Sequence, residues 1–239
     1  MRQLRVLVGC ECSGRVRDAF AARGWEAWSA DLLPSESAPH AWPNEDWEHD
    51  GLAFHYQGDV RDLFDQHWDL FIAHPPCTDL SYAGAVWFKL KDARRGGDGR
   101  MQEAAAFFME MLDAPSPFIA VENPHSIIQE PQWAGPPTQS VQPWWFGDPY
   151  EKRIDLWLKG LPKLMIDNPV QCLGRVATGG GSWRTDKAAG KRAMSTYEDS
   201  EKRVNRAKVR SRTLPGLARA MAAQWGTFAE EHYHAAERC

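Results

Sequence analysis

The N-terminal segment restricts the possible folds most strongly, because a short apolar run leads into a turn bounded by two glycines. Residues 4–8 suit a buried strand, and Gly9-Cys10-Glu11-Cys12-Ser13-Gly14 follows directly. The next segment, 15–23, has the pattern of a helix that ends at Gly24. Nucleotide-binding α/β domains begin with a strand, a glycine turn and a helix in this order.

The rest of the chain continues this alternation. Helices are expected at 101–113 and at 215–236, which has Pro215 at its first position. Strands are expected at 25–30, 53–57, 69–73 and 118–121, with two further candidates at 144–146 and 153–158. The sequence therefore predicts an α/β fold with a mostly parallel sheet and flanking helices.

The chain has 239 residues, of which 43% are hydrophobic and 25% are charged, as in an ordinary folded protein. Its five cysteines include no Cys-x-x-Cys pair, which favours thiols in a reducing compartment over a disulfide framework. No apolar run approaches the roughly 18 residues that a membrane helix needs. We therefore expect a cytoplasmic protein that makes no contact with a membrane.

The charge is distributed unevenly. The net charge is −4, yet residues 1–150 hold 11 basic and 22 acidic side chains, and the segment 163–212 holds 12 basic and 5 acidic ones. A basic segment on an acidic protein is either a solvated surface or a contact for a polyanion such as DNA. Charge alone leaves both interpretations open.

Polar residues follow the predicted strands, at the sheet edge where open α/β folds bind ligands. Asp31 lies 22 residues beyond Gly9, a spacing typical of an acid that binds ribose hydroxyls, and Asp59 follows the next strand. These acids favour an adenosine-type ligand. Cys77 follows two rigid prolines and is a candidate nucleophile, and Glu122 ends an apolar strand, where its carboxylate needs a partner.

These segments resemble the motifs of the DNA cytosine-5 methyltransferase family, in the order that the family has them. Residues 69–81, with Pro76-Cys77, resemble its nucleophile motif, and 118–124, with Glu122-Asn123, resemble its catalytic-acid motif. Segments 8–14, 152–158 and 213–222 resemble its cofactor turn, its basic motif and its last helix. The chain is most similar to the compact, phage-type members.

The resemblance implies a Rossmann-like fold that binds S-adenosylmethionine and methylates carbon 5 of a flipped cytosine in DNA. Cys77 would add to carbon 6 of the ring, Glu122 would bind the ring nitrogen, and Arg153, rather than Lys152, would support the carbonyl or a phosphate. The cofactor contacts implied are Gly9, Cys10, Glu11, Ser13, Gly14, Asp31, Leu32, Asp59, Val60, His74, Pro75 and Arg212.

The same resemblance implies three parts in a monomer from a bacterial or phage-infected cell. Residues 1–162 would form the catalytic core, 163–212 a small target-recognition segment, and 213–239 a helix that returns to the core. The closing loop would be 79–100. The DNA contacts implied are Ser81, Arg94, Arg95, Lys152, Arg184, Lys191 and Arg192.

Some positions depart from the family pattern. Glu11 either meets the cofactor's ammonium group or is exposed. Arg212 stands where the family has a small polar residue, so it either contacts DNA phosphate or pairs with the extra carboxylate of carboxy-S-adenosylmethionine, which would give carboxymethylcytosine. An exocyclic-amino DNA methyltransferase and a non-catalytic nucleic-acid-binding protein with an adenosine pocket are two rival functions for such a chain. His55, His67 and His74 have no spacing that suits a metal site.

Overall fold

A seven-stranded sheet organises the chain in the computed structural model, which describes residues 3–37, 52–82, 99–173 and 212–236. The strand order is β3-β2-β1-β4-β5-β7-β6. The parallel strands are β1 (Arg5–Gly9), β2 (Glu26–Asp31), β3 (Leu52–Gln57), β4 (Leu70–Ala73) and β5 (Ile119–Asn123), while β7 (Ile154–Lys159) runs antiparallel to β5 and to β6 (Gln139–Val141).

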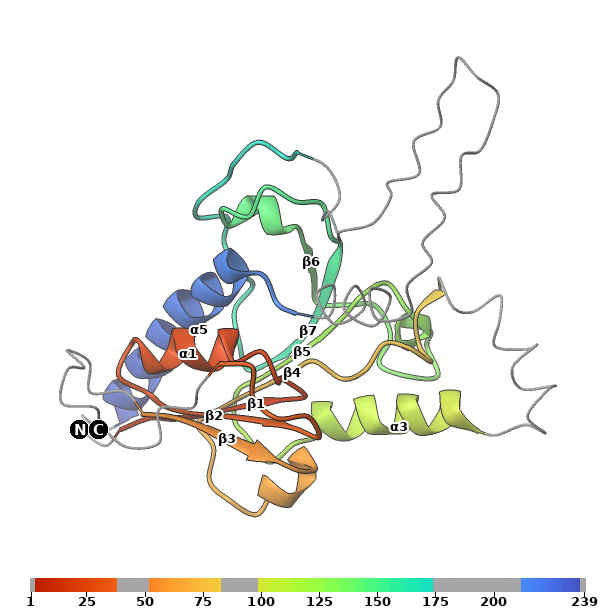
Figure 1. The fold of residues 1–239 in the computed structure, drawn as a ribbon, viewed down its shortest axis with the longest axis horizontal. Coiled ribbons are helices and arrows are strands. Elements are labelled where there is room, and N and C mark those ends of the chain that lie inside the picture. The colour runs from red at the N-terminus through yellow and green to blue at the C-terminus, as the bar shows by residue number, and fades with distance from the viewer. Residues whose placement is uncertain (1–2, 38–51, 83–98, 174–211, 237–239) are drawn as a thin grey trace.

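Helices cover both faces of the sheet (Figure 1). On one face lie α1 (Arg15–Ala21) and α5 (Pro215–Ala236), and on the other lies α3 (Arg100–Leu112). The topology confirms the expected Rossmann-like α/β fold, with a mostly parallel sheet and flanking helices. No helix in the described part of the chain is long and apolar enough to cross a membrane.

Each face of the sheet has its own apolar core. Phe20 of α1 and Trp225 of α5 are fully buried with the strand residues of one face, and Phe108 of α3 lies edge-on against Trp157 on the other face. Because β1, β4 and β5 are covered on both sides, their sequences are continuous apolar runs, as expected for buried parallel strands. This explains why the sequence pattern identified these strands correctly.

Only one of the two strands expected at 144–146 and 153–158 is present in the structure. The segment 153–158 is confirmed as β7, but 144–146 is not a strand: it belongs largely to a short 3-10 turn, η3 (Pro143–Trp145). Proline fixes its own φ and lacks an N–H, so Pro143 favours the first position of such a turn over a place in a ladder. The edge strand is β6, whose Gln-Ser-Val sequence is too short and polar to be recognised.

The start of α5 is bound to the loop that follows η3. Oδ2 of Asp148 accepts hydrogen bonds from the backbone N–H groups of Gly216 (2.7 Å) and Leu217 (3.3 Å). Burial raises the pKa of Asp148, although these two donors act in the opposite direction. A Cβ atom on Gly216 would lie 2.0 Å from the carbonyl oxygen of Phe146, so only glycine allows this close approach.

We predict that Gly216→Ala lowers the free energy of unfolding by about 1–3 kcal/mol, although alanine is the better helix former, because the new methyl group overlaps backbone atoms. Gly226→Ala in the same helix is the control: the nearest atoms to its Cβ would belong to the Arg23 side chain, with Nε at 3.0 Å, and not to the backbone, so stability should be unchanged or slightly raised. Urea denaturation measures both. Equal effects of the two substitutions would contradict the packing that we describe.

Candidate active site at the carboxyl ends of the parallel strands

The turn after β1 is a strained segment. Cys10 has a φ of 58°, the only positive φ of a non-glycine residue in the described chain, and Gly14 has a φ of 71°. A Cβ on Gly14 would lie 2.1 Å from Oγ of Ser37, and a Cβ on Gly9 would lie 2.8 Å from Cγ2 of Val60. The glycines therefore allow the neighbouring segments to approach the turn closely, and such strain is concentrated at functional sites.

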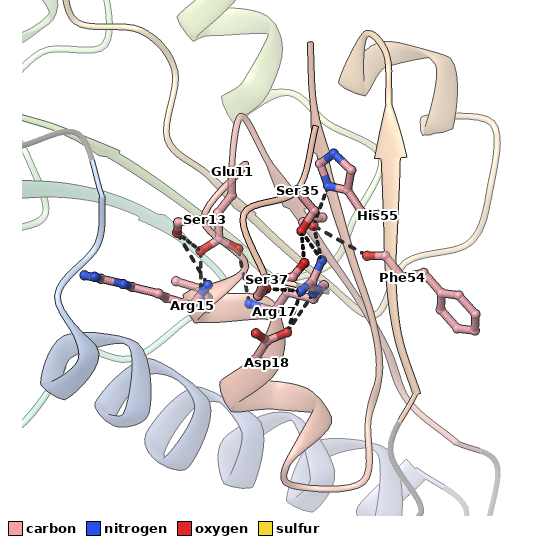
Figure 2. Close-up of polar contacts among 11 residues, drawn as sticks. Glu11, Ser13, Arg15, Arg17, Asp18, Ser35, Ser37, Phe54 and His55 are labelled. Atoms are coloured by element: carbon pink, nitrogen blue, oxygen red, sulfur yellow. Dashed lines mark hydrogen bonds and ion pairs between the residues drawn. The ribbon is translucent and has the colours of Figure 1, made fainter. Parts of the chain in front are cut away.

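Glu11 is buried and binds the first turn of α1 (Figure 2). Its Oε1 accepts hydrogen bonds from the N–H of Val16 (2.8 Å) and the hydroxyl of Ser13 (3.1 Å), and its Oε2 accepts one from the N–H of Arg17 (3.2 Å). The expectation of an exposed Glu11 is therefore wrong. Contact with a cofactor ammonium group stays a prediction.

This carboxylate occupies the place where dinucleotide-binding folds hold a phosphate. A helix N-terminus binds anions through its unpaired N–H groups and its dipole. Here the carboxylate of Glu11 takes the N–H groups of Val16 and Arg17, so a phosphate at this turn would meet a negative charge in place of these two donors. The turn therefore disfavours a phosphate group and favours a positively charged one.

A fully buried arginine fixes the loop after β2, and its role is not visible in the sequence. Arg17 donates to the hydroxyls of Ser29 (3.1 Å), Ser35 (3.2 Å) and Ser37 (2.5 Å), and it pairs with Asp18 at 2.7 Å (Figure 2). A buried charge is tolerated only when it is bonded in this way. In the sequence, an arginine in the first turn of a helix resembles any exposed basic residue. The only pattern that could have indicated this role is the serine-rich loop after β2, with Ser35 and Ser37.

The same loop reaches Arg212. The N–H of Glu36 donates to the carbonyl of Cys12 at 2.7 Å, and the Glu36 carboxylate lies 2.6 Å from Nε of Arg212. Thr213, the next residue, accepts a hydrogen bond from Arg15 of α1 at 2.8 Å. The structure therefore brings Arg212 to the glycine turn, with its charge compensated by a carboxylate of the protein.

Two acids flank the end of β1, as the sequence suggested. Burial raises the pKa of the Cys10 thiol to about 12, and the charges of Asp31 and Asp59 add to this rise. Asp59 is already bound to Arg61, with the closest atoms 2.6 Å apart, and the hydrogen bonds from Arg61 lower the pKa of Asp59. Cys10 is thus a neutral thiol and a poor nucleophile, while Leu32, beside Asp31, is 73% exposed.

Cys77 lies in a tight turn after β4. Its carbonyl accepts hydrogen bonds from the N–H groups of Leu80 (3.1 Å) and Ser81 (2.9 Å), and its side chain is half-buried. The carbonyl of Pro75 accepts a hydrogen bond from the Asn123 side chain at 3.0 Å, which joins this turn to the end of β5. The thiol is therefore presented by a backbone held at several points.

Glu122 faces His74 across the two central strands. In the parallel register Ala73 lies opposite Val121, so the next pair is His74 and Glu122, and Nδ1 of His74 lies 3.3 Å from Oε2 of Glu122. Burial raises the pKa of Glu122, but the His74 hydrogen bond and the positive charges of Lys152 and His74 outweigh it and lower the pKa overall. Glu122 is therefore an ionised, nearly buried carboxylate at neutral pH.

Five buried side-chain polar atoms have no hydrogen-bond partner in the described chain. Four belong to residues at or just beyond the ends of β4 and β5: Nε2 of His74, Oε1 of Glu122, Oδ1 of Asn123 and Oγ of Ser126. The fifth is Nε of Arg212, which is ion-paired with Glu36. Buried polar groups are nearly always bonded, and leaving one unbonded costs about 1–3 kcal/mol. Several such atoms at neighbouring strand ends indicate a place for a polar ligand.

Arg153 lies apart from Glu122. It ion-pairs at 2.9 Å with Asp155, a buried carboxylate that also binds Ser140 and Gln129. Side chains alternate along a strand: Leu156 pairs with Glu122, whereas Asp155, to which Arg153 is bound, pairs with Asn123 and so belongs to the opposite face. The basic residue whose charge acts on Glu122 is Lys152.

Several predicted residues lie outside the described part of the chain: Arg94, Arg95, Arg184, Lys191 and Arg192. Most of the proposed target-recognition segment, 163–212, and of the closing loop, 79–100, also lies there. Within the described residues, no group of His, Cys, Asp and Glu side chains could hold a metal ion.

Comparisons with models of known protein families and with curated proteins find no match to this chain. Among solved structures, a similar chain is an E. coli prophage-encoded protein described as a candidate DNA modification methyltransferase. The two chains are 18% identical with a TM-score of 0.45, and the match covers 71% of this chain and 53% of the other, so this chain spans about half the length of that structure. Similarity this low carries no inference about activity, which rests on the chemistry of the site.

We predict that Glu11→Gln lowers the free energy of unfolding by about 1–3 kcal/mol, because an amide NH₂ group would face a backbone N–H of α1 and leave it unbonded. Glu103→Gln is the matched control: Glu103 is exposed in the first turn of α3, where its charge is favoured by the helix dipole, so less than about 1 kcal/mol should be lost. Urea denaturation compares them. A loss at Glu11 no larger than that at Glu103 would contradict the capping role.

Proposed function

We propose that this protein is a DNA cytosine-5 methyltransferase that uses Cys77 as the nucleophile and Glu122 as the acid. The observation that carries the proposal is that the turn bearing a half-buried thiol is bonded to the strand end of a buried carboxylate, and that Oε1 of this carboxylate and Nε2 of the adjacent His74 are buried without a hydrogen-bond partner in the described chain. A pyrimidine edge, with a ring nitrogen and an exocyclic amine, offers such atoms the partners that they lack.

The residues around the glycine turn fit the cofactor of such an enzyme. Asp31 would bind ribose hydroxyls, and the segment Asp59-Val60 would lie along the adenine. The carboxylate of Glu11 disfavours phosphate and favours a positively charged cofactor. When bound, S-adenosylmethionine supplies the electrophilic methyl group that carbon 5 of the cytosine accepts.

Cys77 performs the first bond-forming step in this proposal. Carbon 5 of cytosine is a weak nucleophile, and addition of the thiolate to carbon 6 converts the ring into an enamine-like species that reacts at carbon 5. Glu122 stabilises the ring nitrogen on which the electron pair arrives. After carbon 5 loses its proton to a base, the bond between carbon 6 and the sulfur breaks and the thiolate is regenerated.

The positive charge of Lys152 lowers the pKa of Glu122, whereas Arg153 is bound to Asp155, so we assign to Lys152, rather than to Arg153, the contact with the pyrimidine carbonyl or a neighbouring phosphate. The target must leave the duplex to reach these groups. The basic residues of the segment 163–212 are the proposed contacts for the DNA backbone. Arg212 is paired with Glu36, so no observation favours a carboxymethyl donor over a methyl donor.

The decisive experiment traps the covalent intermediate. The protein is incubated with S-adenosylmethionine and random-sequence duplex DNA containing 5-fluorocytosine, whose fluorine cannot leave carbon 5, and the products are separated under denaturing conditions. We expect a protein–DNA adduct with the wild type, none with Cys77→Ala, and a rate at least about 100-fold lower with Glu122→Gln.

Cys172→Ala is the control, because this exposed thiol should have no part in the adduct. Methyl transfer without any adduct, or an adduct that survives Cys77→Ala, would contradict the proposal. The first of these outcomes would indicate an exocyclic-amino methyltransferase. DNA binding without methyl transfer by the wild type would indicate a non-catalytic protein.

A further inference from the structure

His74 stands at the centre of the site, yet none of the reaction steps above uses its side chain. That side chain is 7% exposed, and its Nδ1 lies 3.3 Å from Oε2 of Glu122. The backbone leaves it little freedom, because the N–H of His74 donates to the carbonyl of Gly9 at 3.0 Å. A titratable ring is thus fixed against the carboxylate that must act on the substrate.

The reaction needs a proton that Glu122 alone does not hold. When the thiolate adds to carbon 6, the displaced electron pair arrives at the ring nitrogen N3, which is stabilised best by protonation. The pKa of Glu122 is lowered by His74 and Lys152, so at neutral pH its carboxyl group is ionised and can accept a hydrogen bond but cannot donate a proton. The proton must therefore come from a neighbour of Glu122.

We propose that His74 stores this proton and passes it through Glu122 to the cytosine ring, so that the two side chains act as one acid. This inference rests on the proposed function. An imidazole is the side chain best suited to hold a transferable proton near neutral pH. His74 acts through Glu122 and is a positioning and proton-storing residue.

The proton and electron balance is simple. The Cys77 sulfur gives its electron pair to carbon 6, and the ring π electrons move to N3. Before this step the imidazolium Nδ1–H bond of His74 breaks and its proton moves to Oε2 of Glu122, which leaves a neutral imidazole and a carboxylic acid. The carboxylic acid gives this same proton to N3 as the thiolate adds, and Glu122 is again a carboxylate. When the thiolate leaves, N3 returns the proton to Glu122, which passes it back to Nδ1 of His74.

Other titratable groups around the pair have defined effects. Lys152 favours the ionised form of Glu122 and so opposes storage of the proton. Cys77 must lose its proton for attack and limits the reaction at low pH. Cys10, at the end of the neighbouring strand, keeps its proton over the whole working range because burial raises the pKa of its thiol to about 12.

The test measures the rate of adduct formation with 5-fluorocytosine DNA as a function of pH, in a single turnover. His74→Asn places an amide donor near the position of Nδ1, so it keeps a hydrogen bond to Glu122 but cannot store a proton. We expect its rate to fall about 10- to 100-fold at pH 7.5, and the pH at which the rate declines on the basic side to move down by at least about one unit.

Lys152→Gln provides a second test that does not depend on the folding of the His74 variant. Removal of the positive charge favours the protonated pair, so the decline on the basic side should move to higher pH, opposite to the shift in His74→Asn. If the role of His74 were purely structural, His74→Asn would lower the rate of adduct formation without shifting its pH profile.

An unchanged pH profile in His74→Asn, or the same direction of shift in both variants, would overturn the proton-storing role. These results differ from those expected if the proposed function itself were wrong. If it were wrong, the wild-type protein would form no adduct at any pH.

Discussion

The parallel register between β4 and β5 is the constraint on which the site depends, because it sets His74 opposite Glu122 at the edge of the sheet. A carboxylate buried to this extent is tolerated only with bonded partners, and the neighbouring strand supplies one. A register shift by one residue would turn the side chain of Glu122 to the other face and would leave it buried in the apolar core. The packing of both faces of the sheet therefore preserves the geometry of the site.

A second carboxylate defines what the other half of the site can bind. Glu11 takes the N–H groups that a dinucleotide-binding helix would present to phosphate. Arg17 and its serine partners fix the loop after β2 against this turn, and Glu36 of that loop compensates the charge of Arg212. At the proposed nucleoside-binding edge, the charge of Glu11 therefore disfavours the phosphate that usually accompanies a nucleoside.

Much of this was predictable from sequence, and the failures have physical reasons. Buried parallel strands are continuous apolar runs, so β1, β4 and β5 were found, together with the acids and the thiol that follow such strands. The edge strand β6 is too short and polar to be recognised from sequence. The aromatic residues after Pro143 have the composition of a strand, but they form a 3-10 turn. The buried role of Arg17 and the capping by Glu11 depend on tertiary contacts, which no local pattern contains. The proposal of Lys152 in place of Arg153 depends on tertiary contacts as well: the charge of Lys152 acts on Glu122, and Arg153 is bound to Asp155.

The central claim is that the thiol of Cys77 and the carboxylate of Glu122 act on one pyrimidine ring at carbon 5. The most direct measurement is nucleoside analysis by mass spectrometry of DNA incubated with the protein and S-adenosylmethionine labelled in its methyl group. The account predicts label in 5-methyldeoxycytidine, identified against synthetic standards. Label in N4-methyldeoxycytidine or in N6-methyldeoxyadenosine would contradict it, because those products form without a nucleophilic cysteine.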